Sequence, residues 1–170
     1  MLSNSQAESL RPRIRTMQII VAAMMIGVLF TFFLLMSVRE APRFTRELDV
    51  LTLIGLVPAL SVFSAIFFVQ IVQNKLAVKN LGSQFSGEAD DPIVNKAAEL
   101  YQTNLIIRVA LIEGTTFLNV LLYFITGSVF NAGVVGLGVV MLGLQLPTFG
   151  RVIANIDGMI DSAKRESQGF

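Results

Sequence analysis

Residues 17–38 read MQIIVAAMMIGVLFTFFLLMSV, a stretch that decides the fold because it contains no charged side chain. As an α-helix it would extend about 33 Å, which is enough to cross the hydrocarbon core of a bilayer. Arg11, Arg13 and Arg15 precede it, as basic residues precede the apolar part of a secretory signal peptide. The apolar run is too long for a signal peptide, however, and no small-residue cleavage site closes it. We therefore expect a retained membrane-spanning helix.

The composition of the whole chain agrees with a lipid environment. Of the 170 residues, 54% are hydrophobic and only 15% are charged, and the mean hydropathy is +0.69. A water-soluble domain of this length cannot hide so much apolar surface. The net charge of +1 argues against a nucleic-acid-binding protein. Because cysteine and histidine are absent, we expect no disulfide, no thiolate or imidazole metal site, no cofactor and no enzyme.

A second uncharged stretch, residues 50–73, predicts another transmembrane helix. Pro58 lies in its outer half, where it is expected to kink the helix or to break its hydrogen-bond ladder locally. The helical pattern continues beyond this stretch as far as Leu81, and Gly82 supplies a good C-cap. The second helix is therefore expected to project from the membrane.

Asp91 and Pro92 start a third helix, as its N-cap and its first residue, after a linker rich in Gly, Ser and acidic residues at 82–91. This helix should be about 35 residues long, with 104–126 in the lipid. A short turn leads to a fourth span at 129–147, so the last two spans are antiparallel neighbours.

The sequence thus predicts an all-α integral membrane protein with four transmembrane helices in two antiparallel hairpins. Residues 1–16 are expected to form a cytoplasmic tail, 17–149 the transmembrane domain, and 150–170 a cytoplasmic amphipathic helix and tail. Within the transmembrane domain, residues 74–103 form a helical hairpin on the cytoplasmic side. The expected location is the cell (inner) membrane.

The distribution of basic residues predicts that both termini are cytoplasmic, because cytoplasmic loops carry an excess of Lys and Arg. With that orientation, the outer side has only Arg39, Arg43 and Arg46, which lie beside acidic residues. The cytoplasmic side collects Arg11, Arg13, Arg15, Lys75, Lys79, Lys96, Arg151, Lys164 and Arg165.

The cytoplasmic segments are expected to form a small helical bundle. Helical spacing of apolar residues after Pro147 predicts an amphipathic helix. Its apolar face consists of Val152, Ile156, Met159, Ile160 and Ala163. The other two helices offer Leu76, Ala77, Leu81, Ile93, Ala97, Leu100 and Tyr101. The bundle is a docking surface if the protein has a partner, and otherwise its helices only cap one another.

Residues 108–119, RVALIEGTTFLN, place two opposite charges in the third span. Arg108 lies about 10 Å from the midpoint of the span, so its long side chain can reach the cytoplasmic interface. Glu113 lies about 3 Å from the midpoint and cannot reach either surface. A charge there costs at least ~2.5 kcal/mol. The two side chains are about 140° apart around the helix and are not expected to pair.

The polar residues of the third predicted span lie on two different faces of its helix. Arg108 shares its face with Asn104, Thr115, Asn119 and Thr126. Glu113 lies on the other face, with Thr116 at its edge, and the other spans offer only Thr31, Ser61 and Ser64 at the matching depth. Without a cation nearby, the protonated acid is the expected resting form. It could exchange a proton or bind a cation. Alternatively, it could form a hydrogen bond between helices that stabilises their association by roughly 1 to 2 kcal/mol.

The stretch ALIEGTTFLNVLLYF, residues 110–124, lies in a chain with a glycine-rich helix and resembles the proteolipid rotor subunits of rotary ATPases. The resemblance covers little more than this stretch. The chain departs from that pattern because its acid lies on the third of four spans, because it has a long helical cytoplasmic hairpin, and because Arg108 is close by.

The fourth span contains a stripe of small residues, Ala132, Gly136 and Gly143, with Gly133 and Gly138 besides. Small residues let two helix backbones approach closely, so the stripe predicts a helix-association face.

Two functional hypotheses follow. In the first, a homo-oligomer or a complex with other membrane subunits moves protons or cations through a site at Glu113, with Thr116, Ser61, Ser64 and Thr31 as neighbours and Arg108 as an electrostatic gate. In the second, the chain is a non-transporting accessory subunit, in which Glu113 is a protonated hydrogen-bond group and the cytoplasmic helices recruit a partner. Neither hypothesis involves nucleic acid.

Overall fold

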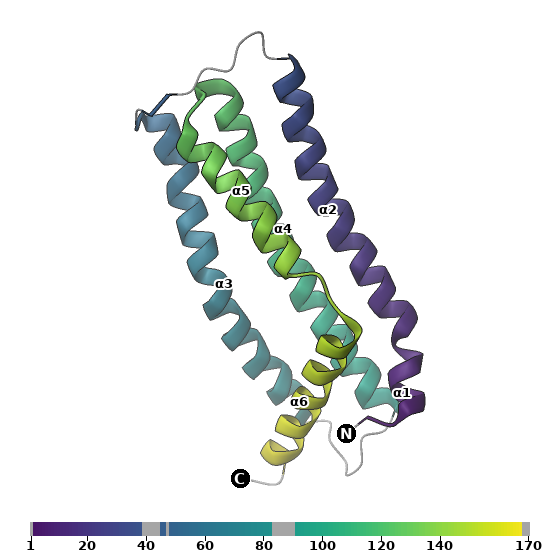
Figure 1. Cartoon of the computed structure of the whole chain (residues 1–170). Coiled ribbons are helices and arrows are strands. Elements are labelled where there is room, and N and C mark those ends of the chain that lie inside the picture. The colour runs from purple at the N-terminus through teal and green to yellow at the C-terminus, as the bar shows by residue number, and fades with distance from the viewer. Residues whose placement is uncertain (1, 39–44, 47, 83–90, 168–170) are drawn as a thin grey trace. The chain divides into compact units, whose positions relative to one another are not determined.

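The computed structural model of the chain describes residues 2–38, 45–46, 48–82 and 91–167. These residues form helices and no strand, with one isolated bridge between Thr45 and Ser128. The helices are α1 (Asn4–Ser9), α2 (Arg11–Val38), α3 (Val50–Gly82), α4 (Asp91–Thr126), α5 (Val129–Leu144) and α6 (Phe149–Ser167) (Figure 1). The prediction of an all-α fold is confirmed.

Two helical segments are long and apolar enough to cross a membrane. They are Asn4–Val38, which joins α1 and α2, and α4. A third candidate arises if α5 and α6 are counted together as one broken span. In α3 the stretch Val50–Ile66 is apolar but shorter than these candidates. Length and composition therefore establish two to three candidate membrane spans.

α3 agrees with the predicted limits of the second helix at both ends. The carboxylate of Asp49 accepts a hydrogen bond of 2.7 Å from the backbone N–H of Thr52, which caps the start of the helix. The helix ends at Gly82, as expected. Pro58 does not interrupt it: α3 is continuous through this residue, which lies on its exposed side.

α4 and α5 start where the sequence predicts. α4 contains 36 residues from Asp91 to Thr126, close to the predicted length. α5 contains 16 residues, about 24 Å of helix, and ends at Leu144, earlier than the predicted 147. Pro147 explains the early end, since the residue before a proline is disfavoured in the helical conformation. The segment with Arg39 and Arg43, which the sequence predicts as an outer loop, and most of the linker 82–91 lie outside the described residues.

The helices belong to two compact units. The first unit comprises the described parts of Met1–Ile19, Phe67–Ile106 and Pro147–Phe170, and the second comprises those of Ile20–Ile66 and Ile107–Leu146. α2, α3 and α4 each contribute one part to each unit.

The core of the first unit contains most of the apolar residues that the sequence assigns to a helical bundle. The apolar face of α6 is buried as expected, through Val152, Ile156, Met159, Ile160 and Ala163. Leu81, Ile93, Ala97 and Tyr101 are also buried, whereas Leu100 is half-buried and Leu76 is 56% exposed. The side chain of Ala77 lies outside the described part of the chain.

The N-terminal residues of the first unit are helical, whereas the sequence predicts only a tail. Ser3 caps α1 in a capping box with Gln6. Leu10, Ile14 and Met17 are 1–3% exposed and join the core. Hydrogen bonds then connect the segment to α4 and α6. They are Leu2 N–H to Asp157 Oδ1 (2.7 Å), Gln6 Nε2 to Asp91 Oδ1 (2.9 Å) and Arg13 to the Asn95 carbonyl (3.1 Å).

α4 is the central helix of the second unit. It meets α2 where the rings of Tyr123 and Phe32 stack with centroids 5.8 Å apart. It meets α3 through a hydrogen bond from Asn119 to the Gly55 carbonyl. The most apolar window of α4 is 50% buried, against 11% for Asn4–Val38. α2 is therefore the more exposed of the two candidate spans.

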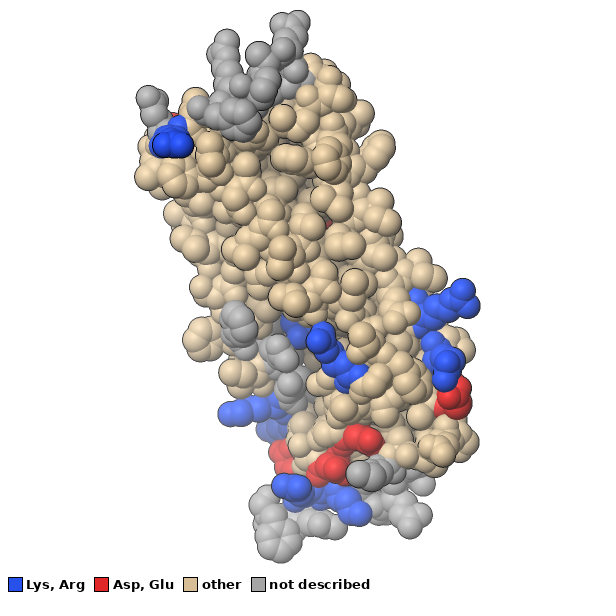
Figure 2. Space-filling view, viewed as in Figure 1, with Lys and Arg blue, Asp and Glu red and all other residues tan. Residues whose placement is uncertain are grey.

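The second unit exposes large apolar side chains on each of its four helices. Phe33 of α2, Leu60 of α3 and Ile125 of α4 are 65%, 65% and 66% exposed, and Val140 of α5 is 58% exposed. The face of this unit seen in Figure 2 is almost free of charged side chains, whereas Lys, Arg, Asp and Glu gather on the first unit. Exposed apolar side chains on all four helices are compatible with a membrane location.

Candidate functional site

Glu113 lies at the edge where the buried face of α4 meets its exposed face. Val109 and Val120, on one side of it, are 0% and 1% exposed. Ala110 and Gly114, on the other side, are exposed, and Glu113 itself is half-buried. Among the residues that the structure describes, its carboxylate takes part in no hydrogen bond or ion pair. One side of the Glu113 side chain is therefore accessible from outside the chain.

In the described part of the chain, Glu113 forms no hydrogen bond with the residues predicted as its neighbours. The hydroxyl of Thr116 is buried and donates to the Ile112 carbonyl of its own helix. Ser61 and Ser64 are exposed on α3, and Ser61 donates to the Val57 carbonyl at 2.8 Å. Thr31 is half-buried. Across the described ranges, no hydrogen bond joins Glu113 to any of these hydroxyls.

Arg108 is buried, whereas the sequence predicts a side chain that reaches the interface. It is 8% exposed and takes part in a polar or electrostatic interaction, as does Asn104. Thr115 and Asn119 share its face of α4 and are 8% and 0% exposed. The reason is the central place of α4, which turns this whole face toward neighbouring helices.

Two asparagines and a glycine form a buried polar cluster that the sequence analysis does not predict. Asn119 of α4 donates through Nδ2 to the carbonyls of Gly55 (3.2 Å) and Thr115 (3.0 Å). Asn131, in the first turn of α5, is 0% exposed. Within the described part of the chain, Asn119 Oδ1 and both polar atoms of the Asn131 amide have no hydrogen-bond partner. We call Gly55, Asn119 and Asn131 the asparagine cluster.

Gly55 is the residue that allows this cluster to form. A Cβ atom at this position would lie 2.6 Å from Asn119 Oδ1, 2.8 Å from Leu122 Cδ1 and 3.0 Å from Asn131 Oδ1. A side chain on Gly55 would therefore have to displace the side chains of Asn119, Leu122 and Asn131. The two amides converge on α3 because α3 has no side chain there.

The chemistry open to the asparagine cluster is hydrogen bonding without proton transfer. Its groups are amides and a backbone carbonyl, none of which titrates near neutral pH. An amide oxygen without a partner can accept from a buried water molecule or from a neighbouring amide. In a membrane such groups hold helices together. No group of three or more acidic residues in the described ranges could hold a metal ion.

The glycines of α5 divide between the inside and the outside of the chain. A Cβ atom on Gly138 would overlap the Thr116 side chain, so Gly138 allows the close approach of α5 to α4. At Gly136 and Gly143 an added Cβ would meet nothing within 4 Å, and Ala132 is half-buried. Two members of the predicted stripe, Gly136 and Gly143, thus have no close neighbour at the Cβ position among the described residues of this chain.

One signal in the sequence points to the asparagine cluster. Asn131 lies three residues after Ser128, at the start of an otherwise apolar helix, and Asn119 lies in the middle of another. Two amides in apolar helices joined by a short turn indicate a shared polar contact. Their convergence on Gly55 depends on the rotation of α3, which the nearly uniform apolar pattern of 50–73 does not specify.

Comparison of the chain with known protein families, with curated proteins and with solved structures finds no match. The site is therefore interpreted from its own geometry and chemistry.

We predict that Gly55→Ala destabilises the protein, because the new methyl group would overlap Asn119 and Leu122. Overpacking of this kind costs about 1–3 kcal/mol, partly offset by a gain of about 1 kcal/mol in helix propensity. Thermal unfolding in detergent, followed by circular dichroism, would show a lower midpoint. The matched control is Gly27→Ala, where an added Cβ meets nothing within 4 Å, so its midpoint should not fall. Equal midpoints for the two variants would contradict the tight packing at Gly55.

Proposed function

We propose that this chain is a four-span protein of the cell (inner) membrane, with both termini cytoplasmic, and that it works as a subunit of a larger assembly. Its spans are 17–38, 50–73, 104–126 and 129–147. The exposed apolar side chains on α2, α3, α4 and α5 support this proposal, because only lipid or other subunits can cover them. The shorter α5 can be accommodated by local thinning of the bilayer.

The topology can be tested with single cysteines, because the natural chain has none. Arg46→Cys should react with a membrane-impermeant maleimide added to intact cells. Ser9→Cys and Ser167→Cys should react only after the membrane is made permeable. Ile26→Cys, in the middle of the first span, should stay unreacted in both conditions. Labelling of Ser9→Cys from outside would contradict the proposed orientation.

The observation that carries the assembly proposal is the place of Glu113. This acid is half-buried at the edge of the exposed face of α4 and has no hydrogen-bond partner among the described residues. A charged acid facing lipid costs at least ~2.5 kcal/mol, and even a neutral one gains from a hydrogen-bond partner. A neighbouring subunit can supply that partner. The exposed Ala110 and Gly114 beside Glu113 leave room for a second helix to approach.

The outward glycines of α5 provide a second argument for association. Gly136 and Gly143 lack close neighbours, although glycine is costly in a helix that gains nothing from it. In lipid, small residues on a helix face are typical of helix–helix contacts. We therefore propose that this face of α5 packs against another subunit, while Gly138 serves the contact inside the chain. In this role Glu113 is a protonated hydrogen-bond group of an accessory subunit.

We predict that the purified protein is oligomeric, and that Glu113→Ala and Gly136→Leu weaken its association. Loss of one hydrogen bond across a membrane interface should weaken it about five- to thirtyfold. Crosslinking and light scattering in mild detergent would measure the effect. Ile26→Val, an exchange between apolar residues on the exposed side of α2 and outside the proposed contact face of α5, is the control and should leave the oligomer intact. A wild-type protein that is monomeric and brings down no other subunit would rule out the assembly.

A second candidate function is the movement of protons or cations through Glu113. It is favoured by the open side of this acid, which a proton or an ion can reach, and by the outward direction of the α3 hydroxyls. Ser61 and Ser64 cannot serve Glu113 from within one chain, but they could face the Glu113 of a neighbouring copy. Thr31 and Thr116 would line the same path, and Arg108 would act as an electrostatic gate on the buried face.

This second function predicts that Glu113→Gln stops transport. Vesicles with reconstituted wild-type protein should dissipate a proton or cation gradient, whereas those with Glu113→Gln should match protein-free vesicles. Glu113→Asp keeps the carboxyl and should retain part of the rate. The control is Glu99→Gln, since Glu99 is exposed and pairs with Lys96 in the first unit. Equal rates for wild type and Glu113→Gln would exclude transport and leave the accessory role standing.

A further inference from the structure

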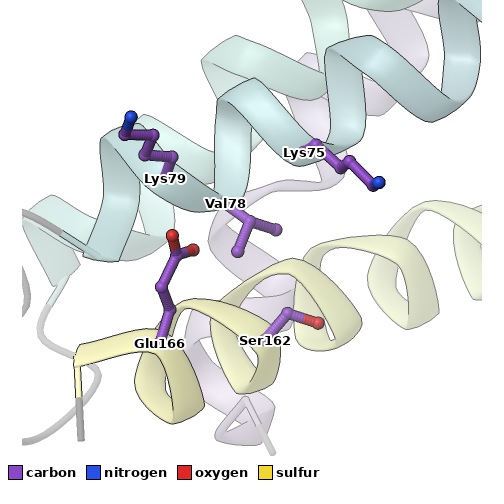
Figure 3. Close-up of a pocket in the computed structure, with 5 residues that line it drawn as sticks. All are labelled: Lys75, Val78, Lys79, Ser162 and Glu166. Atoms are coloured by element: carbon purple, nitrogen blue, oxygen red, sulfur yellow. The ribbon is translucent and has the colours of Figure 1, made fainter. Parts of the chain in front are cut away.

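A groove runs between α3 and α6 in the first unit. Two adjoining pockets of about 480 and 240 Å³ form it, and they share Val78 and Ser162 (Figure 3). We call it the α3–α6 groove. The residues that line it include Lys75, Val78 and Lys79 from α3, and Asn155, Ser162 and Glu166 from α6.

The groove arises because the two helices touch at one end and separate toward the other. A Cβ atom on Gly82 would lie 3.4 Å from the Ala163 carbonyl oxygen and 3.7 Å from Glu166 Cβ, so the helices are in close contact there. Farther along α6, the exposed Gly158 presents no side chain and an added Cβ would meet nothing within 4 Å. The groove therefore opens from Gly82 toward Lys75.

The polar groups of the groove are suited to an anion. Lys75 and Lys79 are exposed, and neither takes part in an ion pair within the described part of the chain. The hydroxyl of Ser162 also lines the groove. Glu166 points from α6 toward α3 beside Lys79 and reduces the positive charge at that end (Figure 3). The positive end of the groove is thus the end at Lys75.

The α3 helix next to the groove carries the apolar surface that a lipid would need. Phe68, Ile71 and Val72 are 70%, 56% and 54% exposed and lie within two turns before Lys75. The same change from charged to exposed apolar residues occurs in α2, where Arg15 is exposed and Ile19 is 62% exposed. Such a change along a helix is typical of the level of the lipid headgroups.

We propose that the α3–α6 groove binds the headgroup of an anionic phospholipid, with its phosphate at Lys75 and Lys79 and its acyl chains along the exposed apolar side of α3. The proposal rests on the proposed function, in which α3 crosses the membrane and ends in the cytoplasm. Anionic lipids are attracted to basic groups next to a membrane span, and basic pockets between helices on the cytoplasmic side bind their headgroups.

A second basic pocket, of about 400 Å³, carries no such proposal. Arg11, Arg15 and Glu8 are among the residues that line it. Arg11 donates to both carboxylate oxygens of Glu8, at 2.7 and 2.9 Å, and this hydrogen bonding lowers the pKa of Glu8. The guanidinium of Arg11 also lies 5.0 Å from the centre of the Phe149 ring. The positive charge of Arg11 is therefore already paired with Glu8 and with the Phe149 ring.

The test uses the full chain purified in detergent and titrated with phosphatidylglycerol or with phosphatidylcholine, with bound lipid counted by native mass spectrometry. We expect preferential binding of phosphatidylglycerol. Each of Lys75→Gln and Lys79→Gln should weaken it about fivefold, and the double variant about thirtyfold. Glu166→Gln should strengthen it, which no general loss of folding would do. The control is the double variant Lys164→Gln, Arg165→Gln, which removes the same charge from α6 outside the groove and should leave the affinity unchanged.

Several outcomes would overturn the proposal. They are equal binding of the two lipids, an equal loss in the control variant, and displacement of phosphatidylglycerol by inorganic phosphate at similar concentration. A soluble acidic peptide that binds in a lysine-dependent way while phosphatidylglycerol does not would instead make the groove a protein-docking site.

A separate measurement distinguishes failure of the lipid-binding proposal from failure of the proposal that α3 crosses the membrane. In vesicles, Ile71→Cys should be protected from an impermeant maleimide on both sides, and Asn80→Cys should react from the cytoplasmic side. If Ile71→Cys reacts freely, α3 does not lie in the membrane at that point and the proposed function fails there. If Ile71→Cys is protected but the two lipids bind equally, only the groove proposal fails.

Discussion

The hydrogen bond from Asn119 to the Gly55 carbonyl is the contact on which the second unit most depends. In lipid no solvent is available to satisfy a polar side chain, so the polar residues of a spanning helix must turn toward other helices. α4 carries Arg108, Thr115 and Asn119 on one face, and all three are buried. This requirement sets the rotation of α4 about its own axis. Because Glu113 is about 120° away from Asn119 around the helix, the same rotation leaves Glu113 at the edge of the exposed face.

The glycines of the second unit fall into two groups, those that pack against a neighbouring helix of the chain and those that do not. Gly55 and Gly138 lie where a Cβ atom would overlap Asn119 or Thr116, and they allow α3 and α5 to approach α4. Gly136 and Gly143 on α5 meet no such neighbour in the described residues, and neither does Gly114 beside Glu113. The proposal that the chain associates with other subunits rests in part on these glycines. The open side of Glu113 belongs to the same outward surface of the chain, as distinct from its packed interior.

The sequence predicts the limits of the long helices and the buried face of α6, because these depend on local signals. Asp91, Gly82 and Pro147 begin or end helices through their own backbone chemistry, and the spacing of Val152, Ile156 and Ala163 defines a face without reference to any neighbour. The rotation of apolar helices is different, since nearly every face of such a helix is apolar. The burial of Arg108, the outward direction of Ser61 and Ser64, and the meeting of Asn131 with Gly55 therefore could not be predicted. The helical N-terminal segment is not predicted because its apolar residues, Leu10 and Ile14, lie among charged ones.

The core of the first unit has a consequence for the order in which the protein assembles. It joins residues near the N-terminus, such as Leu10 and Ile14, to the face of α6, and a hydrogen bond links Leu2 to Asp157 across 155 positions of the chain. This unit therefore cannot close before residues 149–167 have been synthesised, by which time the earlier apolar segments have already left the ribosome. Until then the apolar sides of α2, α3 and α4 in this unit lack their covering helix. A nascent chain in this state offers chaperones and proteases an exposed apolar surface, and α6 removes that surface when it docks.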